Sequence, residues 1–402
     1  MRVIKAWLPG AATALVILLS GVPPVPAQQS MRVGAGDTLT LSGFVSATLY
    51  TNRAMFGGFG QGQNSEWAAQ NGPEVDPVFT DGEIRNTRIR FGFHAAPVMG
   101  AWSPQAAVEM DFFAPPDLPP PFQDEQPRLR LRLAYADLTN GATTIRLGQT
   151  WAPFFGEVPV SLTHIAFPLG YGSAGMVGWR FPGLFVFHEF VPGAPGSAQI
   201  QLAALKGSGP PRSGTDAANN IGTGEASGRP QFEARLNLAH RTTNFAWSSY
   251  AVGHVAWMDS SGTGADGQDL TSWGAEVGAS LAPRKLTLHG NAYYGRGLGP
   301  QFGHITQFGD IRGWGAWCQA GYDFTQHWSV WAFYGGEQPD AARFQRDTGL
   351  SLLRQQNHIS SALLRFRAGR YALGVEYFRA DTRWNTGLRT AEQVSLSANY
   401  SI

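Results

Sequence analysis

The last ten residues of the chain alternate strictly between polar and apolar side chains. Successive side chains of a β-strand point to opposite faces, so this segment would have one polar and one apolar face. The same alternation recurs along the chain, which has no apolar run long enough for a membrane-spanning helix. Together these features predict an all-β protein, a transmembrane antiparallel β-barrel, because a closed barrel satisfies every backbone group inside lipid. The terminal apolar positions are Val394, Leu396, Ala398, Tyr400 and Ile402.

Sixteen segments show this pattern. The predicted strands span residues 38–50, 84–95, 104–113, 128–138, 143–149, 178–191, 198–205, 230–241, 244–258, 270–282, 285–296, 310–324, 328–337, 355–368, 371–381 and 389–402. Pro182 and Gly183 could form a turn, so residues 176–205 could hold two strands or three. Later connections alternate between short and long, as in barrels with short periplasmic turns and long external loops. An even strand number then leaves both termini on the periplasmic side.

The N-terminus has the pattern of a cleavable secretory signal. Arg2 and Lys5 precede an apolar stretch at residues 11–22, and Val25 and Ala27 are small residues before the expected cleavage site. This stretch is shorter than the roughly 20 residues that a membrane span needs, so an anchor is the weaker interpretation. We expect residues 1–27 to be removed and residues 28–402 to form one domain, with the barrel over residues 38–402.

Composition fits a barrel in an outer membrane. The formal net charge of +1 is small, which argues against nucleic acid as a partner. The mean hydropathy of −0.17 resembles that of a soluble protein, as expected when water-facing and lipid-facing positions cancel. Aromatic residues near the predicted strand ends would form belts against outer-membrane lipid, although a soluble β-protein could bury them in its core. The single cysteine, Cys318, excludes a disulfide within the chain and is predicted to be a small strand residue.

Arginines recur opposite the apolar face of several predicted strands. Charged side chains there point into the water-filled lumen, and the planar guanidinium group binds carboxylates and phosphates with two hydrogen bonds. Two interpretations remain open: a guide for small anions, or pairs with lumen carboxylates such as Glu109, Asp111 and Glu233 that stiffen the wall. The candidate pore-lining residues are Arg88, Arg90, Arg128, Arg130, Arg132, Arg146, Arg365 and Arg367.

Residues 150–176 are rich in Pro and Gly and lack alternation, which indicates a long connection. If this loop folds inward, it would set the size of the lumen, since a barrel of sixteen strands encloses an aqueous channel. Phe154 and Phe155 would pack against the wall, and Glu157 and His164 are its ionisable groups. Glu157 would then face the arginines and create a transverse field. An ordinary external loop is the alternative.

Catalytic and metal-binding signals are weak. The sequence contains no nucleophile elbow, phosphate-binding loop or paired metal ligands, so we expect no catalytic residue, cofactor or metal site. Asp259, Asp266 and Asp269 lie in a Gly/Ser-rich region and could bind calcium, but a solvated loop is the simpler interpretation.

One region resembles a known family. The run from Arg130 to Ala136 leads through a tight turn to Ile145–Phe154, which contains Gly-Gln-Thr-Trp at positions 148–151. This arrangement is similar to that of trimeric outer-membrane porins, in particular the DcaP-like porins, where such a motif precedes an inward-folded constriction loop. The resemblance implies a homotrimer of sixteen-stranded barrels, passive diffusion and a preference for anions such as dicarboxylates. The terminal Ile402 departs from the aromatic residue usual in porins.

These observations predict a bacterial outer-membrane porin for small hydrophilic solutes, with a weak preference for anions. A channel specific for phosphate, a sugar or a hydrophobic compound is the alternative, although residues 28–37 are too few to form a plug. An outer-membrane barrel hydrolase is a third possibility, and it would require a hydroxyl or carboxylate paired with a histidine such as His164 or His188 at the barrel rim.

Overall fold

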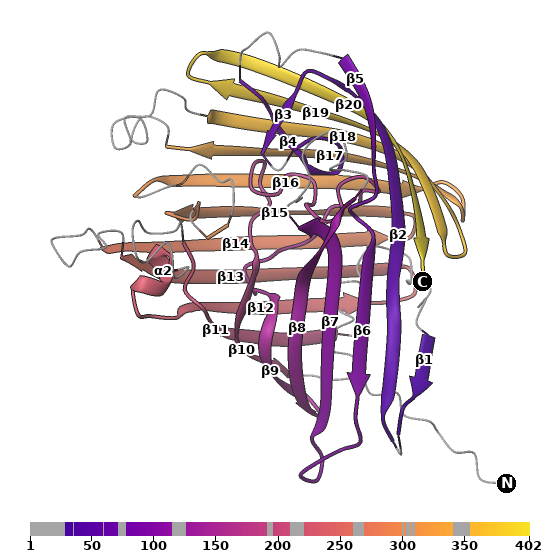
Figure 1. The fold of residues 1–402 in the computed structure, drawn as a ribbon, viewed down its shortest axis with the longest axis vertical. Helices are drawn as coiled ribbons and strands as arrows, with labels where there is room; N and C mark the ends of the chain where they lie inside the picture. The colour runs from indigo at the N-terminus through magenta and orange to yellow at the C-terminus, as the bar shows by residue number, and fades with distance from the viewer. Residues whose placement is uncertain are drawn as a thin grey trace.

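The computed structural model is a closed antiparallel barrel of sixteen strands, as predicted. It describes residues 29–34, 36–58, 60–70, 78–114, 126–190, 196–209, 221–259, 269–299, 301–302, 307, 310–340 and 354–402. The predicted signal at residues 1–27 lies outside this range, as does Asp266. The barrel strands are β2 (Thr38–Arg53), β6 (Arg88–His94), β7 (Ser103–Ala114), β8 (Arg128–Asn140), β9 (Thr143–Trp151), β10 (Arg180–Glu189), β11 (Gly196–Leu205), β12 (Gln231–Arg241), β13 (Phe245–Asp259), β14 (Asp269–Pro283), β15 (Leu286–Arg296), β16 (Arg312–Asp323), β17 (Trp328–Pro339), β18 (Arg354–Ala368), β19 (Tyr371–Trp384) and β20 (Gly387–Ser401) (Figure 1).

The barrel closes where β2 pairs with β20, with Phe44 opposite Ser401 and Arg53 opposite Glu392. A short strand, β1 (Gln29–Arg32), pairs with the start of β2 on the same edge, just beyond the end of β20. The chain terminus is also held at this seam, because the Ile402 amide donates to the Gly43 carbonyl at 2.9 Å.

The other edge of β2 carries a strand in two parts. β5 (Val78–Glu83) pairs with the second half of β2, and β6 pairs with the first half. The sequence pattern predicted one strand over residues 84–95 and none over residues 78–83, so the prediction was wrong at this break. Gly43 lies opposite Ile89, near the start of β6, with a φ of +148°, and a Cβ there would meet the Arg88 carbonyl oxygen at 2.1 Å.

Pro182 and Gly183 do not interrupt β10. Pro182 lies opposite Gln149 of β9, and Gly183 lies opposite both Gly148 of β9 and Leu205 of β11. Between residues 176 and 205 the described chain therefore contains two strands, β10 and β11.

A bulge in β8 changes which residues face the lumen. The pairing of β7 and β8 shifts by one residue between Glu109 and Met110. Simple alternation placed Leu133 and Tyr135 on the lipid face. Both are buried instead, and Arg90 donates a hydrogen bond to the Tyr135 hydroxyl, because the extra residue reverses the alternation.

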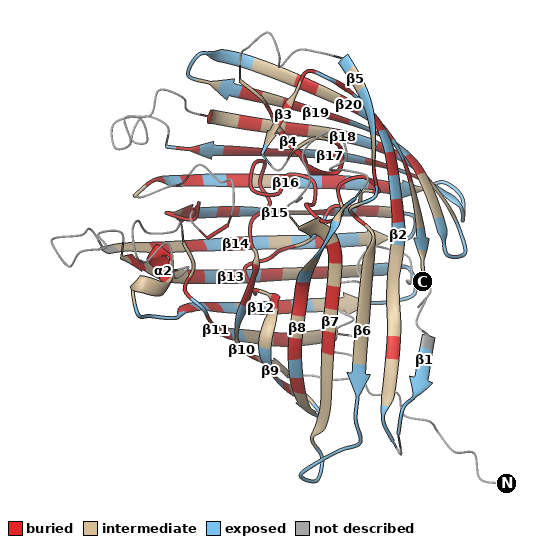
Figure 2. Ribbon diagram, in the orientation of Figure 1, coloured by how far each residue is buried: buried red, intermediate tan, exposed pale blue. Residues whose placement is uncertain are grey.

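Most other strands keep strict alternation (Figure 2). In β19, for example, Val375 is 48% exposed, whereas its neighbour Glu376 is 1% exposed. Trp273, Tyr294 and Trp314 are outward-facing aromatic residues near one end of their strands, and Tyr322 and Trp328 lie near the other. None of the helices in the described part of the chain is long and apolar enough to cross a membrane.

Candidate functional site

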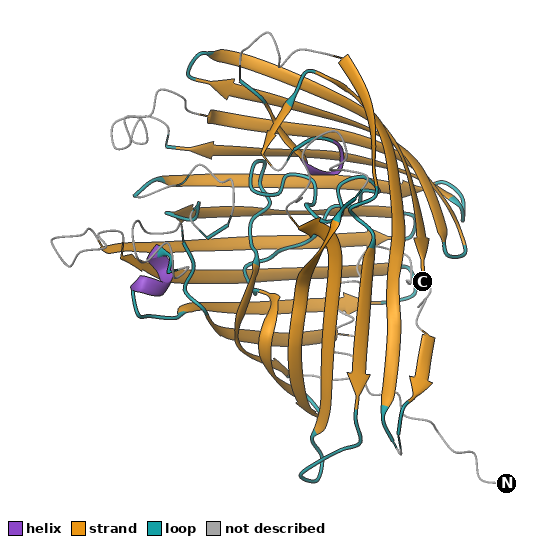
Figure 3. Cartoon of the chain, in the orientation of Figure 1, coloured by secondary structure: helices purple, strands orange, loops and turns teal. Residues whose placement is uncertain are grey.

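Residues 152–179, here called the inward loop, connect β9 to β10 and cross the interior of the barrel (Figure 3). The Phe154 amide donates to Glu233 Oε2 of β12 at 2.7 Å, and the Val160 amide donates to Gln319 Oε1 of β16 at 2.7 Å. Thr163 Oγ1 lies 2.7 Å from the hydroxyl of Ser395 on β20. Because these strands lie around the barrel wall, the segment predicted over residues 150–176 folds inward rather than outward.

The middle of the inward loop is attached to a buried carboxylate. Glu376 of β19 accepts hydrogen bonds from the Ser161 hydroxyl at 2.7 and 3.0 Å, and from the amides of Leu162 and Thr163 at 3.3 Å. His164 Nδ1 lies 3.7 Å from Glu376 Oε1. His164 is 2% exposed, so it holds the loop against the wall rather than lining an open passage.

The start of the inward loop lies beside β12 and β13. Arg235 donates from Nη1 to the carbonyls of Pro153 at 3.1 Å and Phe155 at 2.8 Å. The Glu157 amide donates a hydrogen bond to the Tyr250 hydroxyl at 3.3 Å, and Glu157 lies next to Arg235 instead of facing the arginines of β6 to β8. Burial raises the pKa of Glu157 above its usual range, and this shift is opposed by Arg235 and by a hydrogen bond from Ser248.

Both predicted phenylalanines pack inside the barrel. Phe154 is completely buried against His254 and Phe302, with ring centroids 5.5 and 5.4 Å away. Phe155 stacks on Trp151 at 3.8 Å. The aromatic content of the loop therefore fixes its path through packing, as the sequence led us to expect.

A cluster of arginines lines the wall formed by β6, β8 and the start of β10. We call it the basic wall, and it comprises Arg88, Arg90, Arg130, Arg132 and Arg180. These five guanidinium groups surround two carboxylates, Glu109 and Asp111 of β7.

Two arginines of the basic wall form close ion pairs. Arg132 donates from Nε to Glu109 at 2.8 Å and from Nη1 to Asp111 at 2.7 Å. Arg130 binds Asp111 with two hydrogen bonds, at 2.9 and 2.7 Å. Arg88 and Arg90 are farther away, at 3.7 and 3.8 Å from Glu109. The cluster thus keeps an excess of positive charge.

Arg180 was not singled out from the sequence. It is 5% exposed and lies over the rings of Trp151 and Trp179, at 4.7 and 4.2 Å. Its Nη1 has no hydrogen-bond partner within the described part of the chain. The sequence did not identify Arg180, because the Pro182-Gly183 pair left it uncertain which residues of this strand face the lumen.

The remaining candidate arginines lie outside this cluster. Arg146 forms two hydrogen bonds with Asp137, at 2.7 and 2.8 Å, and is mostly buried. Arg365 lies on β18, where its Nε donates to a serine hydroxyl at 3.2 Å, and Arg367 follows it with partial exposure. Arg128 is exposed at the end of β8. The candidate set therefore separates into one cluster and several isolated positions.

Two further segments, which the sequence pattern assigned to loops, also enter the barrel. Leu298 and Phe302, between β15 and β16, are completely buried, and Phe302 packs on Phe154. The hairpin of β3 (Phe56–Gly58) and β4 (Ser65–Ala68) lies against β18 to β20, where Thr382 accepts from the Ala68 amide at 2.8 Å. Neither segment has strand periodicity, and packing inside the barrel determines its position.

The Gly-Gln-Thr-Trp segment joins the basic wall to the inward loop. Gly148 has a φ of +135°, and a Cβ would approach the Ala134 carbonyl oxygen to 2.3 Å. Gln149 donates to the Arg132 carbonyl at 2.9 Å, and Thr150 accepts from Arg146 at 3.2 Å. Trp151 then stacks on Phe155. Each residue of the motif thus has an identifiable structural role.

Solved structures of outer-membrane channels share this fold. DcaP of Acinetobacter baumannii superposes with a TM-score of 0.66 at 19% identity, covering 92% of this chain and 99% of that one. An anion-selective porin from Comamonas acidovorans has a TM-score of 0.56 at 12% identity, covering 91% and 100%. OmpF of Salmonella typhi has a TM-score of 0.56 at 13% identity, covering 93% and 100%.

Comparison at the level of sequence gives no family. No family model matches the chain, and no curated protein matches it. The assignment therefore depends on the barrel, its apolar outer surface and its structural neighbours. The chain has the fold of the outer-membrane porins, among them DcaP.

Proposed function

We propose that this protein is a porin through which small hydrophilic solutes diffuse passively, with a preference for anions. The observation that carries the proposal is the basic wall, where five guanidinium groups surround Glu109 and Asp111 beside the inward loop. Net positive charge in a confined polar space raises the local concentration of anions and repels cations.

The arginines of this cluster differ in their distance to the two carboxylates and in their exposure, which indicates different roles. The close pairs of Arg130 and Arg132 with Asp111 and Glu109 stiffen the wall. Arg90 lies 3.8 Å from Glu109 and its side chain is 26% exposed, so it is a group that a solute would meet. Arg88 lies 3.7 Å from Glu109, but its Nε and Nη2 atoms are buried, so it adds positive charge to the wall without contacting the solute. We therefore propose both roles considered from the sequence, each for different arginines.

A preference for dicarboxylates follows from the resemblance to DcaP-like porins, and the spacing of several arginines along one wall supports it chemically. Two guanidinium groups of the basic wall can each bind one carboxylate of the same solute. Dicarboxylates should then compete with chloride for the passage more strongly than monocarboxylates of equal size.

Single-channel recording in planar lipid bilayers tests the proposal. Under a tenfold salt gradient, an anion-preferring channel gives a reversal potential of the sign set by chloride. Failure of the purified protein to conduct ions would overturn the porin assignment, and a reversal potential with the sign of the cation would overturn the anion preference.

A substrate-specific channel is the second candidate, and the aromatic content of the interior favours it. Arg130 lies over the rings of Phe113 and Phe167 at 5.4 and 5.1 Å, and Arg180 lies over two tryptophans. A site with cationic and apolar surfaces would retain an anion long enough to saturate. Saturation of the flux of one solute at low concentration would identify this behaviour.

We propose no enzymatic activity. His188 Nδ1 lies 2.9 Å from the Thr143 hydroxyl, and His164 lies beside Glu376. The Ser161 hydroxyl donates to Glu376 rather than to a histidine ring, so that cluster lacks the order of groups needed to activate a nucleophile. Hydrolysis of ester or peptide substrates that disappears in His164→Ala or His188→Ala would contradict this assignment.

A homotrimer is expected from the resemblance to trimeric porins, with outer-membrane lipid around the assembly. Light scattering coupled to size-exclusion chromatography in detergent measures the protein mass of the particle. A particle containing one chain would contradict the trimer and leave the channel itself unaffected.

A further inference from the structure

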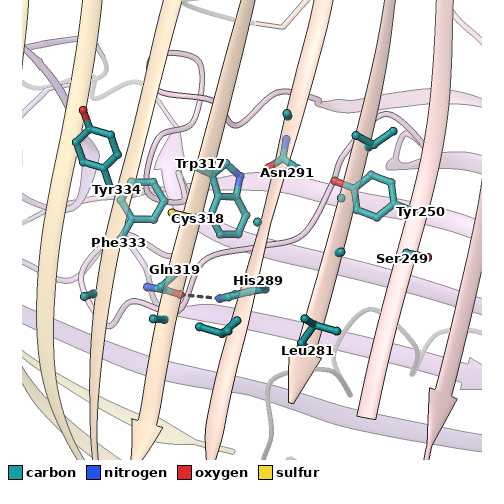
Figure 4. Close-up of a pocket in the computed structure, with 18 residues that line it drawn as sticks. Ser249, Tyr250, Leu281, His289, Asn291, Trp317, Cys318, Gln319, Phe333 and Tyr334 are labelled. Atoms are coloured by element: carbon teal, nitrogen blue, oxygen red, sulfur yellow. Dashed lines mark hydrogen bonds between the residues drawn. The ribbon is translucent and has the colours of Figure 1, made fainter. Parts of the chain in front are cut away.

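The outer face of the barrel contains a hollow of about 810 Å³ across β13 to β17 (Figure 4). No residue of the inward loop contributes to it, and the residues that open onto it alternate with lumen-facing ones. We call this depression the outer hollow. The outward-facing residues that line it include Ala279, Leu281, Leu288, Gly290, Cys318, Ala320 and Tyr334.

Strand register explains why the surface is hollow. Residues directly opposite each other in an antiparallel pair share a face, so rows run across the strands. One row passes from Ala279 through Gly290 to Cys318 and reaches Tyr334. Small side chains in the row leave a depression, and the exposed Tyr334 ring bounds it on one side. Beyond Tyr334 the row continues to Ser360 of β18.

The outer hollow is apolar and lies within the lipid-facing band. Leu281 and Leu288 form its lower border toward the short turn between β14 and β15, and Leu281 lies near the end of its strand in Figure 4. A rise of about 3.4 Å per residue and a strand tilt of about 40° place Ala279 roughly 13 Å in depth from Arg284. About 15 Å is half the thickness of the hydrocarbon layer, so the hollow occupies the periplasmic half and reaches its middle.

Two basic residues form the turn below this hollow. Arg284 and Lys285 are both exposed, and neither forms an ion pair with another described residue. Lys285 is one of two lysines beyond the predicted signal, and the other, Lys206, is paired with Glu225. Asp323 of β16 lies beside this turn, where its backbone amide donates to the Lys285 carbonyl. Its carboxylate interacts electrostatically with Arg365 and Arg367.

We propose that the outer hollow and the Arg284–Lys285 turn form a binding site for an anionic phospholipid of the periplasmic leaflet. The phosphate group binds the two basic side chains, and one acyl chain extends past Leu281 and Leu288 into the row of small residues. Charge complementarity selects the lipid head group, and van der Waals contact with the small Ala, Gly and Cys side chains holds the acyl chain. Cys318 acts here as a small apolar wall residue.

Native mass spectrometry of the detergent-solubilised protein tests this site. Phosphatidylglycerol and phosphatidylcholine with identical palmitoyl chains are titrated separately, and bound lipids per chain are counted. We expect tighter retention of phosphatidylglycerol by the wild type, and at least a fivefold loss of that preference in the double variant Arg284→Gln, Lys285→Gln. Arg370→Gln, at the turn between β18 and β19, is the matched control and should retain the wild-type preference.

A second pair of variants tests the acyl chain. Ala320→Leu fills the hollow from the lipid side and should reduce retention of both lipids, whereas Ala136→Leu, on the outer face of β8, should not. Equal retention of the two lipids by the wild type, or no effect of the double variant, would overturn the proposal. If Ala320→Leu changed the number of chains per particle instead of lipid retention, a second copy of the chain would be the occupant and the lipid site would be rejected. Conductance should be unchanged in all four variants, because none of the altered residues lies in the basic wall or the inward loop.

Discussion

Arg132 and Asp111 form an ion pair, with 2.7 Å between Nη1 and Oδ2, in which both side chains are almost completely buried. A solute moving through the barrel cannot reach either group. Their role is therefore to fix the wall, and Arg90, whose side chain is 26% exposed, remains available to a passing anion. From the sequence all of these arginines belonged to one pattern, and burial is what separates them.

Replacing both Arg130 and Arg132 by alanine should lower the permeability of anions relative to cations. It leaves Asp111 and Glu109 buried without their closest partners, so the local charge shifts toward negative. Breaking a buried pair in this way also costs about 3–5 kcal/mol of stability. The reversal potential under a salt gradient and the unfolding temperature in detergent measure the two effects. Arg365→Ala, on β18, is the control, and an unchanged reversal potential in the double variant would contradict the assignment.

Arg88→Ala should change selectivity in the same direction with a smaller loss of stability. Its nearest carboxylate oxygen is 3.7 Å away, and Glu109 keeps its hydrogen bond from Arg132. The same two measurements apply. A selectivity change no larger than that of Arg365→Ala would show that solutes do not pass close to Arg88.

Deleting much of residues 155–170 should enlarge the single-channel conductance, on the order of twofold, because the loop occupies part of a lumen that is otherwise an aqueous channel. Glu376→Gln is a milder variant. It removes the charge that accepts hydrogen bonds from Ser161, Leu162 and Thr163, and should increase current fluctuations without deleting any chain. Unchanged conductance after the deletion would contradict the proposed constriction.

Arg235→Ala should loosen the start of the inward loop. Arg235 holds two carbonyl groups of that segment, at 3.1 and 2.8 Å, and stacks on Tyr250 at 3.7 Å. We expect larger and noisier single-channel currents. Arg235→Lys keeps the charge but loses the planar fork, so partial recovery would separate geometry from charge. Identical currents from alanine and wild-type proteins would rule out this anchoring role.

Anion preference should increase as the pH falls through the titration of Glu157. Burial raises the pKa of this carboxyl above its usual value of 4.5, so it takes up its proton at a higher pH than an exposed glutamate. Its contribution to stability therefore decreases as the pH rises above 4.5 and becomes constant above the raised pKa. Reversal potentials measured between pH 4 and pH 8 should show this step, and Glu157→Gln should remove it. A step of equal size in that variant would assign the titration to another group.

The sequence was sufficient to predict the barrel, because lipid outside and water inside impose alternation on most strands. The sequence did not predict the irregularities of the strands. The break between β5 and β6 and the bulge in β8 each depend on pairing with a neighbouring strand, which a single segment does not reveal.

The site was predicted less completely than the fold. Composition identified the inward loop, and Phe154 and Phe155 pack as expected. Glu157 lies elsewhere because Tyr250 and Arg235, distant in sequence, position the backbone around it. The β3–β4 hairpin depends on packing against β18 to β20, which come much later in the chain, and Arg180 depends on how β10 pairs with Trp151 of β9.

The seam between β2 and β20 also constrains how the protein is made. Thr48 and Ser397 are 349 positions apart and meet with 2.8 Å between their hydroxyl oxygens. The ring can close only after the final strand has been exported, and a polypeptide cut short would keep two unpaired edges open to other chains. Assembly is therefore expected to be slow and to require complete synthesis, so premature termination anywhere along the message should yield aggregation-prone fragments rather than smaller pores.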